Sequence, residues 1–300
     1  MKTRSVYLVV LISTFFWGAN FALAGPILRD IPSLWAAALR FSIAALIMIV
    51  YALWRKEDLL SALRRHAPVY LLIGAIGICG FNLLFFAAMR TASAGDAALI
   101  MATNPLLTTL LAAVALGERP SARLLISLPL ALFGVIVVIS GGDLKHLMHL
   151  QIVQGDILML GANVAWAFYN VISRSAMPKL SALTNTAWVM TAGAVMLLGT
   201  ALFSTQILVA PGINAGIALL LMATGGTVLA YLFWNTGIAH LGAGGTALFM
   251  NLIPVFALLV VAIMGKLPSG VQLVGGALVI AGVSITMLSP KKQNSTPLAS

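Results

Sequence analysis

The sequence is poor in charge and in cysteine. Only 8% of its 300 residues are charged, against roughly 25% in a soluble domain. With 61% hydrophobic residues and a mean hydropathy of +1.06, the chain has too little polar surface to enclose a water-soluble core. A single cysteine, Cys79, excludes a disulfide scaffold and a cysteine metal cluster. These shortages exclude a soluble enzyme and predict a polytopic membrane protein.

Catalytic and ligand-binding motifs are missing as well. The sequence has no Ser-His-Asp set, no His-Glu-x-x-His and no phosphate-binding Gly-Lys motif, so we do not expect an enzyme. His146 and His149 have the spacing of metal ligands but no evident third ligand, and neither a metal nor another cofactor is expected. The net charge of +10 is divided among short stretches rather than gathered in one patch, which argues against nucleic acid as a partner.

Long apolar runs fill most of the chain. A membrane helix needs roughly 20 apolar residues, and continuous runs of that length favour helices over the alternating strands of a barrel. We therefore predict an all-α integral membrane protein with ten spans and no extramembrane domain. The predicted spans are residues 6–24, 33–54, 69–89, 95–116, 122–140, 153–173, 183–203, 214–239, 244–264 and 270–289.

The basic residues predict the orientation. With the N-terminus in the cytoplasm, the inside segments hold 12 Lys and Arg and the outside segments hold 4. Because cytoplasmic loops carry the excess of positive charge, both termini are expected in the cytoplasm. The lipid bilayer is thus a predicted partner, and a bacterial inner membrane is the expected location.

The chain contains an internal repeat. Trp17 matches Trp166 and Pro105 matches Pro254, both at an offset of 149 residues. The stretch Gly-Glu-Arg-Pro-Ser at 117–121 matches Gly-Lys-Leu-Pro-Ser at 265–269 at an offset of 148, as Gly134 matches Gly282. These anchors predict two related halves.

Each half would contain five spans. Because five is odd, the second copy must enter the membrane upside down, which is how many secondary transporters are built, with the substrate site between the repeats. The predicted organisation is a first five-helix repeat (1–140), a periplasmic linker (141–152), a second five-helix repeat (153–289) and a cytoplasmic tail (290–300).

Polar and aromatic side chains recur on single faces of the predicted spans. Ser13, Trp17 and Asn20 share one helical face, and the stripe around Trp166 repeats this pattern. Rings and amides together suit a zwitterion with an apolar side chain. The candidate substrate-binding residues are Trp17, Asn20, Asn82, Phe85, Met101, Asn104, Asn163, Trp166, Tyr169, Asn170, Tyr231, Asn235, Met250 and Asn251, with Pro105 and Pro254 as candidate hinges.

Several of these residues have a structural alternative. Asn side chains also join helices within membrane bundles, and mid-span prolines can be tolerated kinks. Trp234 could equally anchor the chain at the membrane interface. Arg40, the one basic residue well inside a span, could bind a substrate carboxylate, but we favour contact with the interface or with neighbouring carbonyls.

The sequence resembles a known family. The stretch Trp-Gly-Ala-Asn-Phe at 17–21, the pair Asn104-Pro105 and the turn at 117–121 are similar to those of the EamA-type branch of the drug/metabolite transporter superfamily. Within that branch, the chain looks most like YddG-type exporters of aromatic and other amino acids. The resemblance implies ten helices in two inverted repeats and export as the direction of transport.

The expected function is export of aromatic and other apolar amino acids by alternating access. All seven acidic residues map to loops or span ends, so no proton relay is expected and uniport is the simplest mechanism. Three alternatives stay open: a multidrug exporter of aromatic cations, a nucleotide-sugar or sugar-phosphate carrier, and a channel-like pore. No obligate protein partner is evident.

Overall fold

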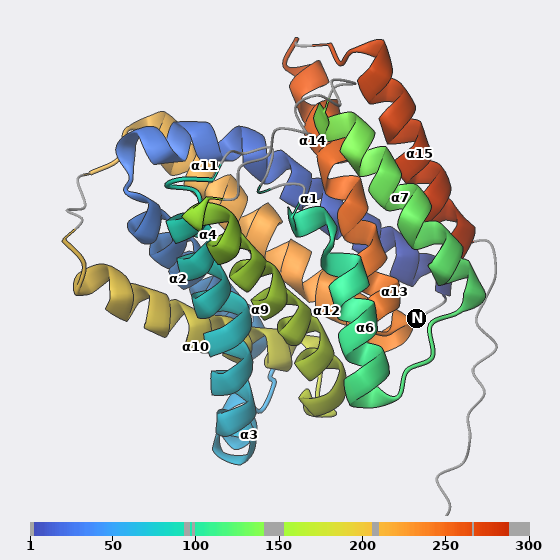
Figure 1. The fold of residues 1–300 in the computed structure, drawn as a ribbon. Helices are drawn as coiled ribbons and strands as arrows, with labels where there is room; N and C mark the ends of the chain where they lie inside the picture. The colour runs from blue at the N-terminus through green and yellow to red at the C-terminus, as the bar shows by residue number, and fades with distance from the viewer. Residues whose placement is uncertain are drawn as a thin grey trace, which may run out of the picture.

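The computed structural model describes residues 3–92, 97, 100–140, 153–205, 210–265 and 267–287. Within these ranges every regular element is a helix (Figure 1). The first half contains α1 (Thr3–Asp30), α2 (Ser33–Trp54), α3 (Leu59–Ile73), η1 (Gly74–Gly80), α4 (Phe81–Ala88), α6 (Asn104–Leu116) and α7 (Ala122–Ser140). The second contains α9 (Gln154–Ala176), α10 (Ala182–Leu202), α11 (Ile213–Ala223), η2 (Thr224–Leu229), α12 (Ala230–Leu241), α13 (Ala243–Ala247), η3 (Leu248–Leu252), α14 (Ile253–Ile263) and α15 (Gly270–Met287).

Most of these helices can cross a membrane. Among the described residues, seven continuous helical stretches are long and apolar enough, or eight when α1 is included, which bends by 44° between Asn20 and Ala22. Two further apolar helices, Ile100–Leu116 and Gly270–Ile285, are shorter. Each of the ten predicted runs overlaps one of these segments. The chain is therefore an all-helical, multi-pass membrane protein.

Two helices extend beyond the apolar runs that predicted their spans. The third span was expected to begin at residue 69, but α3 begins at Leu59, where the Asp58 carboxylate accepts a hydrogen bond of 3.1 Å from the Ser61 N–H. The first helix continues past residue 24 to Asp30. Hydropathy detects the apolar part of a helix, whereas capping decides where the helix itself begins and ends.

Helical irregularities occur at matched places in the two halves. The π-helix η1 interrupts the third span at 74–80, and the π-helix η2 interrupts its counterpart at 224–229. Gly117 and Gly265 both adopt a positive φ, of 64° and 93°, which favours glycine at the end of a helix. The two halves thus share backbone irregularities that the hydrophobic pattern alone does not specify.

The strongest helix contacts also respect the repeat. Helix α1 packs against α12 and α14, and its counterpart α9 packs against α4 and α6. Helix α2 packs against α10, and α7 lies along α15 at one edge of the molecule (Figure 1). Exchanging α1, α12 and α14 for α9, α4 and α6 reproduces the first two of these contacts, as repeated halves predict.

Small residues permit the closest of these contacts. A Cβ on Gly134 would lie 2.7 Å from the Val279 nitrogen, and one on Gly282 would lie 2.8 Å from the Ala131 nitrogen. These two glycines are matched in the repeat, and they let α7 and α15 approach closely. A Cβ on Gly74 would similarly lie 2.8 Å from the Gly193 nitrogen of α10.

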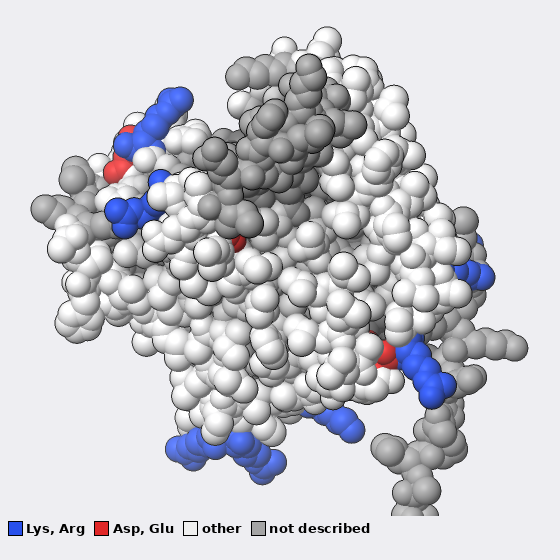
Figure 2. Space-filling view, viewed as in Figure 1, with Lys and Arg blue, Asp and Glu red and all other residues white. Residues whose placement is uncertain are grey.

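Charge separates the two ends of the bundle. A broad uncharged belt divides a strongly basic end from the opposite end (Figure 2). Among the described residues, the opposite end carries only Arg29 and Arg90. Nine basic residues lie at the end that holds the start of α1: Arg4, Arg55, Lys56, Arg64, Arg65, Arg119, Arg123, Arg174 and Lys179.

Candidate functional site

Rings from both halves meet at the centre of the bundle. The Trp17 and Trp166 indoles contact each other edge to face, with ring centroids 5.4 Å apart. We call the full set the aromatic cluster, in which neighbouring ring centroids lie 4.8–6.4 Å apart. Because the rings contact one another, they fill the space between the halves in this conformation. The aromatic cluster consists of Trp17, Phe41, Trp166, Tyr169, Tyr231 and Trp234.

Irregular backbone and a thioether hold the two indoles. The Trp17 Nε1–H donates to the Gly226 carbonyl at 3.1 Å, and Gly226 lies within η2. The Trp166 Nε1 lies 3.2 Å from the Met250 sulfur in η3. A π-helix commonly marks a functional position, because it displaces one backbone group from the regular pattern. Both indoles are thus fixed by elements of the second half.

Amides of the second half are used inside the protein. The Tyr169 hydroxyl donates to Asn235 Oδ1 at 2.7 Å, and the Asn235 amide donates to Thr186 at 3.0 Å. The Trp234 Nε1–H donates to Asn170 Oδ1 at 2.8 Å. These bonds orient the rings of the aromatic cluster from the side of the basic end.

Asn104 and Asn163 join α6 to α9. The Asn104 amide donates to Asn163 Oδ1 at 2.7 Å, and the Asn163 amide donates to the Ile100 carbonyl and to Thr103. Both side chains are fully buried. For this pair the arrangement is that of helix-joining amides. Asn82 is also buried, and its amide donates a hydrogen bond of 2.7 Å to the Ile78 carbonyl of its own span.

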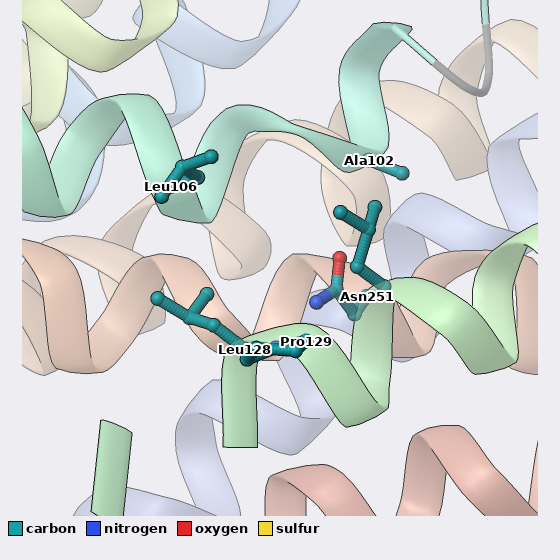
Figure 3. Close-up of a pocket in the computed structure, with 6 residues that line it drawn as sticks. Ala102, Leu106, Leu128, Pro129 and Asn251 are labelled. Atoms are coloured by element: carbon teal, nitrogen blue, oxygen red, sulfur yellow. The ribbon is translucent and has the colours of Figure 1, made fainter. Parts of the chain in front are cut away.

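Two candidate asparagines have buried amide atoms without a hydrogen-bond partner. Asn20 Oδ1 is buried and accepts no hydrogen bond. Both polar atoms of the Asn251 amide are buried and unpaired. Figure 3 shows this amide between Ala102 and Leu106 of the α6 segment and Leu128 and Pro129 of α7, beside a cavity of about 140 Å³. Unpaired buried polar atoms are rare, so both positions are candidates for contact with a ligand or water.

The remaining candidates lie beside the aromatic cluster. Phe85 stacks on Phe81 at 5.8 Å, and Phe81 in turn contacts Trp166 at 5.4 Å. Met101 packs against two clusters of buried residues, one of which contains Trp166. The sequence analysis missed Phe41 and Phe81, because nothing in their spacing distinguishes them from apolar side chains that face lipid.

Both candidate hinge prolines follow a break in their span. Pro105 lies in the first turn of α6, after the turn at Thr103. Pro254 lies in the first turn of α14, directly after the 3₁₀ helix η3. A proline tolerates this place because the first N–H groups of a helix have no intrahelical acceptor. Each proline thus lies at a junction between two helical segments of one span, and its role as a hinge stays a prediction.

Trp234 is not an interface anchor. Its side chain has no exposed surface, and its ring centroid lies 4.8 Å from that of Trp17. The position near the end of α12 suggested an anchor because distance along a helix says nothing about which neighbours enclose it. In the bundle, α1 and α9 enclose that face.

An ion pair connects helix ends at the basic end. Arg174 Nε lies 3.2 Å from Glu118 Oε1, and Arg174 also donates to the Ala239 carbonyl at 2.6 Å. The ends of α6, α9 and α12 are thereby tied together. Among the described residues no group of three His, Cys, Asp or Glu side chains could hold a metal ion, and His146 and His149 lie outside them.

The fold and site define a multi-pass helical membrane transporter whose two halves share one backbone plan. The chain belongs to the EamA-like transporter family, in the drug/metabolite transporter superfamily, and the family model matches residues 4–140 and 153–288 separately. It is a transporter and not an enzyme.

Three known proteins show the range of the similarity. The uncharacterized transporter YyaM of Bacillus subtilis is 35% identical over 94% of this chain and 93% of its own. A protein of Salmonella typhimurium named "Probable amino-acid metabolite efflux pump" is 27% identical over 96% of each chain. A solved crystal structure aligns with a TM-score of 0.80 at 22% identity, covering 95% of this chain and 98% of the other, and supports the fold.

Proposed function

We propose that this protein exports amino acids with aromatic or other apolar side chains by alternating access across a bacterial inner membrane. The observation that carries the proposal is the aromatic cluster, which both halves supply and which lies where they meet. Rings give broad apolar contact, and the adjacent amides can bind both ends of a zwitterion. The printed name of the Salmonella typhimurium relative, an amino-acid metabolite efflux pump, agrees with this substrate class.

The transport cycle requires ten spans arranged as two inverted repeats. The matched π-helices, the matched proline breaks and the exchangeable helix contacts support this arrangement. Inverted halves can exchange their conformations, which turns an inward-open shape into an outward-open one. Bending at Pro105 and Pro254 would separate the rings that now contact one another.

The charge distribution supports an orientation. The basic end holds nine of the described Lys and Arg residues and the opposite end two, so we assign the basic end and both termini to the cytoplasm. In that orientation the Arg174–Glu118 pair lies at the cytoplasmic surface. Export would then begin at the end where the three helices are tied together.

We further propose that transport is a uniport. The described acids, Asp30, Glu57, Asp58, Glu118 and Asp156, all lie in loops or in the first or last turns of helices. Asp96 and Asp143 lie outside the described residues. A proton relay past the substrate would need an ionisable group near the midplane. Net flux would therefore follow the substrate gradient.

Counterflow in proteoliposomes tests the proposed function. Vesicles loaded with unlabelled phenylalanine should accumulate labelled phenylalanine transiently, because a carrier exchanges one molecule for another. Methionine should compete, since an aromatic and thioether lining accepts several apolar shapes. A channel-like pore would equilibrate the label without overshoot. Transport of a sugar phosphate but of no amino acid in the panel would contradict the proposal.

One observation favours a second candidate function, export of aromatic cations. Adjacent indoles such as those of Trp17 and Trp234, whose planes are tilted by 53°, can bind a cation over their faces. A planar aromatic cation that drives counterflow better than any amino acid would favour this candidate. The same vesicles, loaded in turn with each compound, make the comparison direct.

A further inference from the structure

Arg40 carries a charge that no carboxylate among the described residues pairs. It lies in the third turn of α2, and its Nε is buried without a hydrogen-bond acceptor. One terminal nitrogen lies 3.5 Å from the Met222 sulfur, and the guanidinium carbon lies 4.6 Å from the centre of the Phe41 ring. Among the described residues the only ion pair is Arg174–Glu118, so no carboxylate neutralises Arg40.

These contacts leave most of the guanidinium's binding capacity unused. A guanidinium offers five N–H donors in a planar fork, and a thioether is a weak acceptor. The sequence analysis favoured contact with the interface or with neighbouring carbonyls. Among the described residues no carbonyl accepts a hydrogen bond from Arg40, so the second of these two expectations is not met there. An ionised side chain inside a membrane bundle that lacks a partner is a candidate for ligand contact.

Arg40 borders the aromatic cluster. The Phe41 ring contacts Tyr231 at 5.7 Å, so the residue after Arg40 is already part of the cluster. Met222, which Arg40 contacts, precedes Gly226 by four residues, about one turn of the same span. Gly226 in turn accepts the hydrogen bond from Trp17.

An unpaired acceptor lies against the same span. A Cβ on Gly226 would overlap the Asn20 amide, so this amide lies directly on η2. Its Oδ1 is the buried atom that accepts no hydrogen bond. An unpaired cationic donor and an unpaired amide oxygen thus lie about one turn apart along one span, with rings beside both.

We propose that Arg40 binds the carboxylate of the transported molecule and that Asn20 Oδ1 accepts a hydrogen bond from its ammonium group. The inference rests on the proposed function and narrows the substrate class to carboxylate-bearing compounds with an apolar side chain. The planar fork matches the two carboxylate oxygens, and the aromatic cluster receives the side chain. A ligand carboxylate would supply the counter-charge that no described residue provides.

The proposal predicts which part of a ligand each residue detects. Loss of the Arg40 charge should weaken every ligand that carries a carboxylate. Loss of the Asn20 oxygen should weaken only ligands that carry an ammonium group. Neither change should alter contact with the apolar side chain.

Binding to the full chain in detergent tests this, with the fluorescence of the clustered tryptophans as readout. The probes are L-phenylalanine, its amide, which lacks the carboxylate, and 3-phenylpropionate, which lacks the ammonium group. We expect Arg40→Gln to raise the Kd of phenylalanine and 3-phenylpropionate about tenfold and that of the amide less than about twofold. Arg40→Lys keeps the charge but lacks the planar fork of donors, so its Kd for phenylalanine should lie between those of the wild type and Arg40→Gln. Asn20→Leu should weaken phenylalanine and not 3-phenylpropionate.

The ratio between probes within one variant separates ligand contact from a general loss of fold. The matched control is Arg29→Gln, at an exposed position at the end opposite the basic end. It should leave the ratios between the Kd values of the three probes unchanged. Equal weakening of acid and amide in Arg40→Gln would overturn the inference, as would wild-type protein that binds neither carboxylate. Where Arg40→Gln does not fold, an unchanged ratio in Arg40→Lys would overturn it.

The inference and the proposed function can fail separately. Wild-type protein that exchanges phenylalanine in vesicles while Arg40→Gln keeps its acid-to-amide ratio would overturn the inference alone. Wild-type protein that binds 3-phenylpropionate through Arg40 but moves no amino acid would overturn the proposed function and leave the carboxylate site standing.

Discussion

The two halves of the chain share a backbone plan and differ in the side chains they place on it. At an offset of 149 residues, Asn20 and Asn82 of the first half correspond to Tyr169 and Tyr231 of the second. The two tyrosines are members of the aromatic cluster, whereas Asn20 keeps an unpaired oxygen and Asn82 bonds to its own span. The two halves therefore share their helix geometry. Different residues at matched positions make the two sides of the site chemically different.

The difference has a direction. Asn20 lies about one turn from Trp17 toward the end that carries Arg29, and Tyr169 lies about one turn from Trp166 toward the end that carries Arg174. One side of the tryptophan pair is thus lined by an amide and the other is filled by rings. A pair of similar halves can produce a site with two chemically distinct ends.

The largest expected effect comes from two matched glycines. A Cβ on Gly77 would overlap the Tyr169 ring, which is buried and stacked on Trp166, whereas a Cβ on Gly226 would meet the Asn20 amide. We expect Gly77→Val to lower the free energy of unfolding in detergent by about 3 kcal/mol, and Gly226→Val by less, because an amide can rotate away. Equal losses would show that the two contacts are equally rigid.

A smaller effect should come from the amide that joins α6 to α9. Asn163→Leu removes the partners of Asn104, Ile100 and Thr103, and we expect it to cost about 2 kcal/mol. The matched position is Thr14, whose hydroxyl bonds only to carbonyls of its own helix, so Thr14→Val should cost under about 1 kcal/mol. Chemical unfolding of both variants in the same detergent measures the difference. A larger loss in Thr14→Val would reverse this assignment.

Removal of the Tyr169 hydroxyl should lower the free energy of unfolding by less than Asn163→Leu does. Tyr169→Phe leaves Asn235 Oδ1 without its 2.7 Å donor, and we expect a loss of about 1 kcal/mol with the ring packing intact. Asn82→Leu in the first half breaks only a bond within its own span and should cost less than Tyr169→Phe. The same unfolding experiment ranks the two. The comparison fails if the order is reversed.

The smallest effect on stability is expected at the cytoplasmic ion pair. Glu118 is partly exposed, so Glu118→Gln should change the free energy of unfolding by under about 1 kcal/mol. Because we propose uniport, this variant should also leave flux independent of an imposed pH gradient. Uphill accumulation that collapses with an uncoupler and is lost in Glu118→Gln would contradict the proposed mechanism.

Much of the architecture could be predicted from residue order. Low charge and long apolar runs require helices in a membrane, because lipid offers no partner for an unpaired backbone group. The matched Pro105 and Pro254, and the matched glycines at 117 and 265, marked the repeat, and the structure gives each pair the same local geometry. The family resemblance rested on such residues and is confirmed by the match to both halves.

Only the tertiary structure decided how the polar side chains are used. Sequence analysis left two roles open for every asparagine, substrate binding and the joining of helices. In the structure Asn163 hydrogen-bonds to the α6 segment, whereas Asn20 has an unpaired oxygen. Sequence analysis favoured the interface or neighbouring carbonyls for Arg40, but among the described residues the packed helices offer its Nε no acceptor and its charge no carboxylate. A hydropathy pattern specifies which segments enter the membrane. The partners of a buried polar atom depend on which helix comes to lie opposite it, and that is settled only when the two halves pack together.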